Sequence, residues 1–149
     1  MKSRHVLILN GPNLNLLGER EPQIYGTDTL TSIEARCRQR ARELELTMDF
    51  QQSNHEGRLI DCVHMARQEA AAIIINPAGL SFTSVSLLDA LKAFDGLKIE
   101  VHLTNPHKRE SYYHRSLVSY TATAVIAGLG SDGYIAALGA LASRLPAVR

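Results

Sequence analysis

Short strand-like runs alternate with stretches of helical spacing along almost the whole chain, and this alternation limits the fold more than any other feature. Residues 72–75 are wholly apolar over a length typical of a strand that a parallel sheet buries on both faces. Residues 5–9 have a similar length and branched content. Further strands are predicted at residues 47–53, 98–103 and 121–127, and helices at about residues 29–46, 55–69, 84–94 and 132–145.

Strands separated by helices are joined by right-handed crossovers and pair in parallel, so the sequence predicts an α/β fold. We expect a five-stranded parallel sheet with helices on both faces. A chain of 149 residues is most simply one domain over residues 1–149, large enough to bury an ordinary core.

Composition and charge exclude several classes of protein. Lys and Arg number 16 against 15 Asp and Glu, so the basic excess of a nucleic-acid-binding protein is missing. The apolar run near the N-terminus is too short for a signal peptide or a membrane span, which predicts a cytoplasmic protein without a membrane partner. Cys37 and Cys62 lie in helical patterns without a CxxC spacing and are expected to be reduced core thiols.

The loop at residues 9–26 follows the first strand, and ligands of open α/β sheets bind beyond the carboxyl ends of strands. Such loops usually have about 2 to 6 residues, so its extra length favours a functional role. Asn13 offers amide donors and acceptors. Arg20 and Tyr25 suggest a general base, because a guanidinium held near a phenol favours the phenolate.

Polar residues also end two other predicted strands, at Asn76 and at residues 102–105. Parallel strands bring these ends to one edge of the sheet, where a crevice would hold the Tyr25 phenol, the His102 imidazole and several amides. Glu100 lies two residues before His102, on the same strand face, where it can orient or charge the ring. Such a set suits proton abstraction beside a carbonyl, enolate stabilisation and acid-assisted loss of a hydroxyl.

Seven blocks of this sequence resemble the type II dehydroquinases, the second class of 3-dehydroquinate dehydratase. They are LNGPNLNLLG with the following EP and YG at residues 9–26, QSNHEG at 52–57, IINP at 74–77, TSV at 83–85, EVHLTN at 100–105, RE at 109–110 and GLGSDGY at 128–134. The resemblance covers essentially the full chain. It implies a flavodoxin-like sheet, conversion of 3-dehydroquinate to 3-dehydroshikimate without cofactor or metal, and a homododecamer of four trimers.

The resemblance also implies roles for individual residues. Tyr25, activated by Arg20, would take a proton from C2 of the substrate, and Asn13 would help to hold the enolate, directly or through water. His102 would protonate the departing C1 hydroxyl, so no Schiff-base lysine is needed. The same step serves both aromatic biosynthesis and quinate breakdown.

The substrate-binding residues follow from the same resemblance. Asn76 and the segment at Leu103 and Thr104 match the family's carboxylate site. Asp89 matches a residue that the family offers across a trimer interface. The loop that carries Arg20 matches its mobile lid.

Two residues depart from the family pattern. Phe82 stands where the family usually has His, and Tyr113 stands where it usually has Arg. In the family both bind ring hydroxyls, and losing such donors affects discrimination strongly. His114 or Arg115 could swing in to compensate for the missing Arg. Two alternatives therefore stay open: a paralogue that dehydrates a related cyclic hydroxyketone, and a non-catalytic binder of a shikimate-like ligand.

Four other interpretations of the sequence are rejected. Residues 128–133 spell GxGxxG, but a dinucleotide site needs a further strand with an acidic residue about 20 positions on, so a strand-to-helix turn is expected. The sequence around Ser81 does not complete the GxSxG of a serine hydrolase. A phospho-receiver domain would need acidic residues at the strand ends that hold Asn10 and Asn76. The histidines have no zinc-site spacing.

Overall fold

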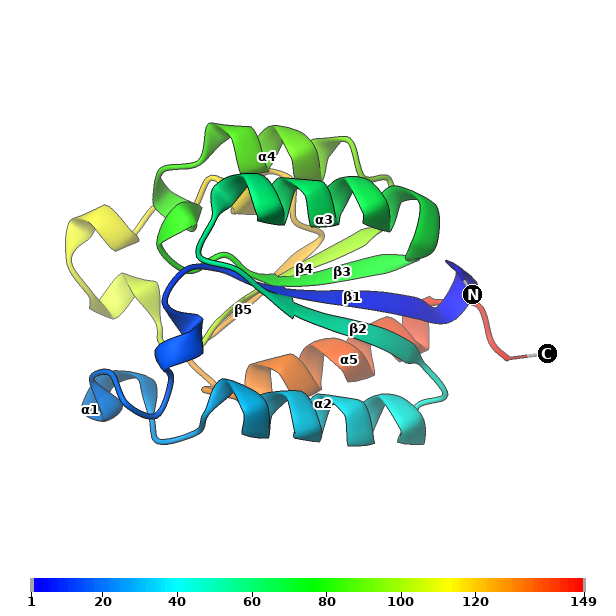
Figure 1. The fold of residues 1–149 in the computed structure, drawn as a ribbon, viewed down its shortest axis with the longest axis horizontal. Coiled ribbons are helices and arrows are strands. Elements are labelled where there is room, and N and C mark those ends of the chain that lie inside the picture. The colour runs from blue at the N-terminus through cyan, green and yellow to red at the C-terminus, as the bar shows by residue number, and fades with distance from the viewer. Residues whose placement is uncertain (1, 149) are drawn as a thin grey trace.

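Five parallel strands form one sheet between two layers of helices (Figure 1). The computed structural model describes residues 2–148. The strands are β1 (His5–Asn10), β2 (Thr47–Gln52), β3 (Ala72–Asn76), β4 (Leu97–His102) and β5 (Ala124–Ala127), and they lie in the order β2-β1-β3-β4-β5. This is the flavodoxin-like order, so the predicted α/β fold class is confirmed.

Four longer helices cover the sheet, two on each face. They are α2 (Leu30–Glu43), α3 (Glu56–Glu69), α4 (Val85–Lys92) and α5 (Asp132–Arg144). Figure 1 shows α3 and α4 over one face, and α2 and α5 over the other. No helix among residues 2–148 combines the length and apolar character needed to cross a membrane.

The alternation of side chains along the strands divides the core into two halves. On β1, Val6 and Ile8 pack in the cluster under α2 and α5, whereas Leu7 and Leu9 pack in the cluster under α3 and α4. All four are buried, because helices cover both faces of the sheet. Cys37 and Cys62 are free thiols buried in these two clusters, as the sequence predicted.

Element boundaries differ from the predicted ones mainly where local polar contacts take over. Thr29 caps α2 through a capping box with Ser32, in which each side chain accepts a hydrogen bond from the other's backbone. The predicted last strand starts three residues late, at Ala124, because a 3-10 turn at Val118–Tyr120 precedes it and Thr121 ends that turn. The four-residue helix α1 (Pro22–Tyr25) was not predicted, since it is too short to show a periodicity.

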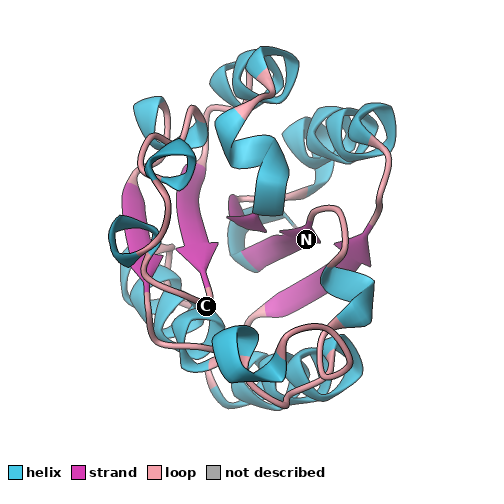
Figure 2. Cartoon of the chain, turned by 90° about the vertical axis from the view of Figure 1, so that its left-hand side faces the viewer, coloured by secondary structure: helices cyan, strands magenta, loops and turns pink. Residues whose placement is uncertain are grey.

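The carboxyl ends of the strands face the viewer in Figure 2, and the long connecting segments gather over this end of the sheet. Asn10 and Asn76 are paired in register at the ends of β1 and β3. Gly11 follows β1 so close to Pro77 that an added Cβ would lie 2.4 Å from the Pro77 carbonyl oxygen, so glycine is needed there. The glycines of residues 128–133 make the turn from β5 into α5, with positive φ at Gly128 and Gly130.

Candidate active site

A cavity of about 190 Å³ lies beyond the carboxyl ends of β1, β3 and β4. Of the predicted site residues, nine line it: Asn13, Arg20, Tyr25, Asn76, Phe82, His102, Leu103, Thr104 and Tyr113. The remaining lining residues are Pro12, Leu14, Leu17, Ala78, Gly79, Pro106 and Arg109. Segments far apart in the sequence thus converge on one cavity.

Two guanidinium groups lie near the Tyr25 ring. The Cζ atom of Arg20 lies 5.1 Å from the centre of the Tyr25 ring, and that of Arg109 lies 5.3 Å from it. The pKa of Arg109 is raised: partial burial opposes its charge, but interactions with the Tyr25 and Tyr113 phenols outweigh that effect. Two cations beside one phenol stabilise a negative charge on its oxygen. Arg109 is a site residue that the sequence analysis noted only as part of a motif.

Aromatic rings form the distal wall of the cavity. Phe82 and Tyr113 meet edge to face, with ring centres 5.2 Å apart, and Phe82 is stacked 6.4 Å from the His102 ring. Arg109 lies over Tyr113, with its Cζ 4.0 Å from the ring centre. The two residues that depart from the family pattern are therefore in contact with each other, and Arg109 links them to Tyr25.

His102 is held by a buried carboxylate. Its Nε2 is hydrogen-bonded to Oε2 of Glu100, which has no exposed surface, and Ser119 donates to the other Glu100 oxygen at 2.6 Å. Burial raises the pKa of the Glu100 carboxyl, but the hydrogen bonds, first from His102, outweigh it and keep the pKa below its ordinary value. A carboxylate at this position stabilises an imidazolium and leaves Nδ1 as the ring nitrogen that can act on a ligand.

Asn13 reaches the cavity from a turn with a left-handed backbone, at φ 71°. Its backbone N–H donates to Oδ1 of Asn54 at 2.9 Å, and Gln52 donates to the same oxygen at 3.1 Å. Gln52 also donates to the Gly11 carbonyl at 3.2 Å. Gln52, at the end of β2, and Asn54, just after it, therefore hold the first part of the loop after β1 in place.

Three predicted contributors do not reach the cavity of their own chain. Asp89 lies on the exposed side of α4 and is absent from the lining. The Nε2–H group of His114 donates to the Arg109 carbonyl oxygen at 2.6 Å, and Arg115 donates to the Tyr120 hydroxyl at 2.9 Å. Both line a neighbouring hollow that His102 also lines, and the expectation that one of them swings in to replace the missing Arg stays a prediction.

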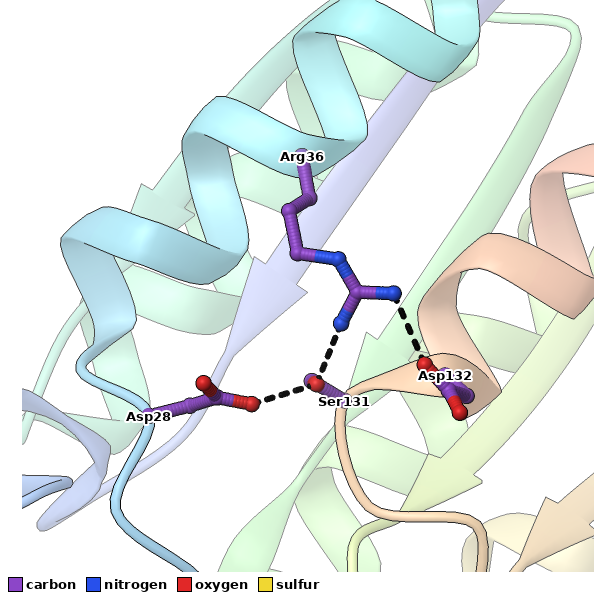
Figure 3. A network of polar contacts seen from close by, with 4 residues as sticks. All are labelled: Asp28, Arg36, Ser131 and Asp132. Atoms are coloured by element: carbon purple, nitrogen blue, oxygen red, sulfur yellow. Dashed lines mark hydrogen bonds and ion pairs between the residues drawn. The ribbon is translucent and has the colours of Figure 1, made fainter.

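The lid, defined here as residues 19–28, is tied down at its far end (Figure 3). Asp28 accepts a hydrogen bond from the Ser131 hydroxyl at 2.6 Å, and Arg36 of α2 donates to the same hydroxyl at 2.6 Å. Arg36 also forms an ion pair with Asp132 at 2.7 Å. This clasp, formed by Asp28, Arg36, Ser131 and Asp132, joins the end of the lid to the start of α5.

The cavity combines the groups of an acid–base reaction. Among residues 2–148, no group of three or more His, Cys, Asp or Glu side chains is placed to share a metal ion. A phenol near two cations and an imidazole backed by a carboxylate line the same cavity, with amides of Asn13 and Asn76 beside them. This arrangement suits removal of one proton and delivery of another to a small polar ligand.

Comparison with known proteins gives consistent results. The sequence model of the family Dehydroquinase class II matches residues 4–142, which include every residue that lines the cavity. A 3-dehydroquinate dehydratase of Cereibacter sphaeroides is 55% identical over 129 residues, 87% of this chain and 88% of that protein. One of Streptomyces avermitilis is 55% identical over 130 residues, 87% of this chain and 82% of that protein.

A solved structure extends the similarity to three dimensions. The crystal structure of the type II dehydroquinase from Propionibacterium acnes superposes with a TM-score of 0.92 at 43% identity. The superposition covers 95% of this chain and 98% of that one. The order of strands and the placement of the cavity-lining segments therefore belong to an arrangement already seen in that crystal structure.

Proposed function

This chain belongs to the class II dehydroquinase family, and we propose that the cavity dehydrates 3-dehydroquinate to 3-dehydroshikimate through the residues assigned below. The chain is a dehydratase, and thus a carbon–oxygen lyase. The observation that carries the assignment is the convergence of Tyr25, from the loop after β1, and His102, from the end of β4, on one cavity.

Tyr25 acts first, as the general base. With Arg20 and Arg109 near its ring, the phenolate is stabilised and accepts the proton from C2, beside the C3 carbonyl. The electron pair left on carbon moves into the carbonyl, which gives an enolate. Asn13 lines the cavity next to this group and offers an amide donor to the enolate oxygen, directly or through water.

His102 completes the elimination. The enolate re-forms the carbonyl as the C1–O bond breaks, and the imidazolium of His102 donates its proton to the departing hydroxyl, which leaves as water. The buried Glu100 carboxylate stabilises this imidazolium and orients its ring. The product keeps a carbon–carbon double bond conjugated with the carbonyl.

The substrate is held at two ends. Asn76, Leu103 and Thr104 lie together at the ends of β3 and β4, and we assign the carboxylate to them. The ring hydroxyls face the wall of Phe82 and Tyr113, where the Tyr113 phenol and the Arg109 guanidinium supply polar groups. No observation at the cavity favours either alternative, which were a related cyclic hydroxyketone as the substrate and a shikimate-like ligand that is bound without turnover.

We also propose the wider setting of the enzyme from its family resemblance. It forms a homododecamer of four trimers in the cytoplasm, works as one domain without a cofactor, and Asp89 reaches a neighbour's cavity across the trimer interface. Val85, Val125 and Leu129 support an oligomer, since these apolar side chains are exposed in the single chain. Sedimentation analysis tests this, and a monomer at micromolar concentration would contradict it.

Ultraviolet absorbance during incubation with 3-dehydroquinate tests the proposed function, because the conjugated enone of the product absorbs there. The wild type should give a steady rise, and Tyr25→Phe should lose most turnover while it still binds the product 3-dehydroshikimate. Tyr112→Phe, an exposed tyrosine outside the cavity, is the matched control. A folded wild-type protein that leaves 3-dehydroquinate unchanged would refute the proposal.

A further inference from the structure

A fully buried tyrosine connects the ends of two strands beneath the cavity. Tyr134, near the start of α5, has no exposed surface. Its hydroxyl donates to Oδ1 of Asn10 at 2.7 Å and accepts from Nδ2 of Asn76 at 3.1 Å. Asn10 and Asn76 are 0% and 3% exposed. Of these three residues only Asn76 lines the cavity, so the network is a support for one ligand-facing side chain.

Backbone groups at both ends determine the direction of every hydrogen bond in this network. Asn10 donates through Nδ2 to the Gln51 carbonyl at 3.0 Å, and a carbonyl only accepts, so the Asn10 oxygen faces the tyrosine. Asn76 accepts through Oδ1 from the Ala78 N–H at 3.2 Å, and an N–H only donates, so the Asn76 nitrogen faces the tyrosine.

The tyrosine hydroxyl is the one group that joins these two ends without conflict. It carries a single hydrogen, which goes to the Asn10 oxygen, and its lone pair accepts from Asn76. If Asn76 turned over, its oxygen would face a hydroxyl whose hydrogen is already used, and its nitrogen would face the Ala78 N–H. Both contacts would be unfavourable in a buried site.

We propose that Tyr134 is a positioning residue that fixes Asn76 as a hydrogen-bond donor toward the substrate. The amide nitrogen of Asn76 has two hydrogens, and Tyr134 accepts one of them. The Asn76 oxygen faces the Ala78 N–H, and the second amide hydrogen is the donor that this side chain keeps for a ligand. An acceptor such as a carboxylate oxygen fits this position, and a donor such as a hydroxyl hydrogen does not.

The fold brings Tyr134 to this place through close packing of α5 on the sheet. An added Cβ at Gly133 would lie 3.2 Å from Cγ1 of Val101 on β4, so the glycine lets the first turn of α5 approach the strands. Asn10 and Asn76 lie on the face of the sheet that α5 covers, in register with each other. The network therefore depends on three elements and not on one local motif.

Tyr134→Phe tests the inference, because it removes one oxygen and keeps the packed ring. The inference rests on the proposed function, which puts the substrate carboxylate against Asn76. We expect KM for 3-dehydroquinate and Kd for 3-dehydroshikimate to rise about tenfold, while kcat changes by less than about threefold. Tyr120→Phe, which also loses one hydrogen bond but at an exposed position, should leave both constants unchanged.

A merely structural role for Tyr134 would give a different result. It would lower Tm and leave KM and Kd at the wild-type values, and that outcome in a folded variant would overturn the proposal. Asn10→Leu is a second variant, because it breaks the network at a residue that does not line the cavity. It should raise KM and Kd in the same way, and unchanged constants would count against the network.

A measurement on the wild type keeps the inference testable if both variants fail to fold. In a crystal of the wild-type protein grown with 3-dehydroshikimate, a carboxylate oxygen should lie within about 3.2 Å of Asn76 Nδ2. A hydroxyl donor in that position, or no contact with Asn76, would overturn the proposal. Failure of the proposed function is distinguishable, since the wild type would then bind the product without turning over 3-dehydroquinate.

Discussion

The floor and the lid of the cavity are built in opposite ways. The floor, made of Asn10, Asn76 and Tyr134, is buried, and backbone groups determine the direction of its hydrogen bonds. In the lid every residue from 19 to 28 is exposed except Tyr25, which is half-buried. The residue assigned to the first proton transfer therefore lies on an exposed segment, whereas Asn76, assigned to ligand binding, lies in a buried network.

This difference follows from what each region must do. A floor that presents one donor to a carboxylate gains affinity from rigidity, because little freedom is lost on binding. We propose that the lid opens to let the substrate in, and segments with few buried contacts open at low free energy. Glu21 adopts a left-handed backbone at φ 43°, and Gly26 has φ 87°, so the lid also contains two residues with a positive φ, one on each side of α1.

The largest expected effect comes from Tyr25, the half-buried residue of the lid. Tyr25→Phe keeps the ring against Arg20 and Arg109 but removes the base, so kcat should fall about 1,000-fold with KM little changed. Initial rates with 3-dehydroquinate measure this. Activity within tenfold of the wild type would mean that another group takes the proton. The general base would then not lie on the lid.

Glu100→Gln tests the rigid side of the site. The amide keeps the shape but not the charge that stabilises the His102 imidazolium, so kcat should fall about 100-fold. His102→Gln provides the comparison, and the double variant should be no worse than the more impaired single variant if the two act as one unit. Additive losses would show that Glu100 acts independently of His102.

Glu100 should also make stability depend on pH. Its pKa in the folded protein is below its ordinary value of 4.5, because hydrogen bonds outweigh burial. The carboxylate thus contributes stability that is present above about pH 4.5 and is lost as the pH falls through the lower, folded-state value. Thermal unfolding of wild type and Glu100→Gln should diverge at neutral pH and converge in acid. A constant difference in Tm would contradict this.

The two arginines beside Tyr25 sharpen the comparison further. Arg109 is braced by its contact with Tyr113, whereas Arg20 is about half exposed and pairs with Glu21 at 3.6 Å. Arg109→Gln and Arg20→Gln should each lower kcat/KM about tenfold or more, because the negative charge on the Tyr25 oxygen loses a nearby cation. Initial rates with 3-dehydroquinate measure this, and wild-type rates in both variants would exclude the arginines from activating Tyr25.

The smallest effect is expected at the clasp. Arg36→Gln breaks an exposed ion pair and a hydrogen bond, so the free energy of unfolding should fall by less than about 1 kcal/mol. Because Asp28 then loses part of its support, the lid should be cleaved faster by a protease while the floor stays protected. Arg38→Gln, which loses another exposed pair of α2, is the control. Equal rates of cleavage in both variants would show that the clasp does not hold the lid in place.

Periodicity alone was enough for most of the fold. The apolar run that became β3 and the polar residues at the strand ends predicted a parallel sheet with a site at its carboxyl edge. The predicted boundaries were wrong where contacts outside the segment decide them. The strand β5 starts three residues later than predicted because a turn precedes it, and the four-residue helix α1 is too short to show a periodicity in the sequence. Single residues of the site were predicted through the family motifs, and their roles stay predictions.

The sequence by itself determined the alternation of strands and helices, and with it the edge of the sheet where polar residues collect. That is a local property, because side-chain spacing along one segment sets which face is buried. Only the tertiary structure decided that Arg109 lies beside Tyr25, that His114 and Arg115 point into another hollow, and that Tyr134 meets Asn10 and Asn76. Those contacts join residues distant in the chain, so the packing of whole elements, and no local pattern, determines them.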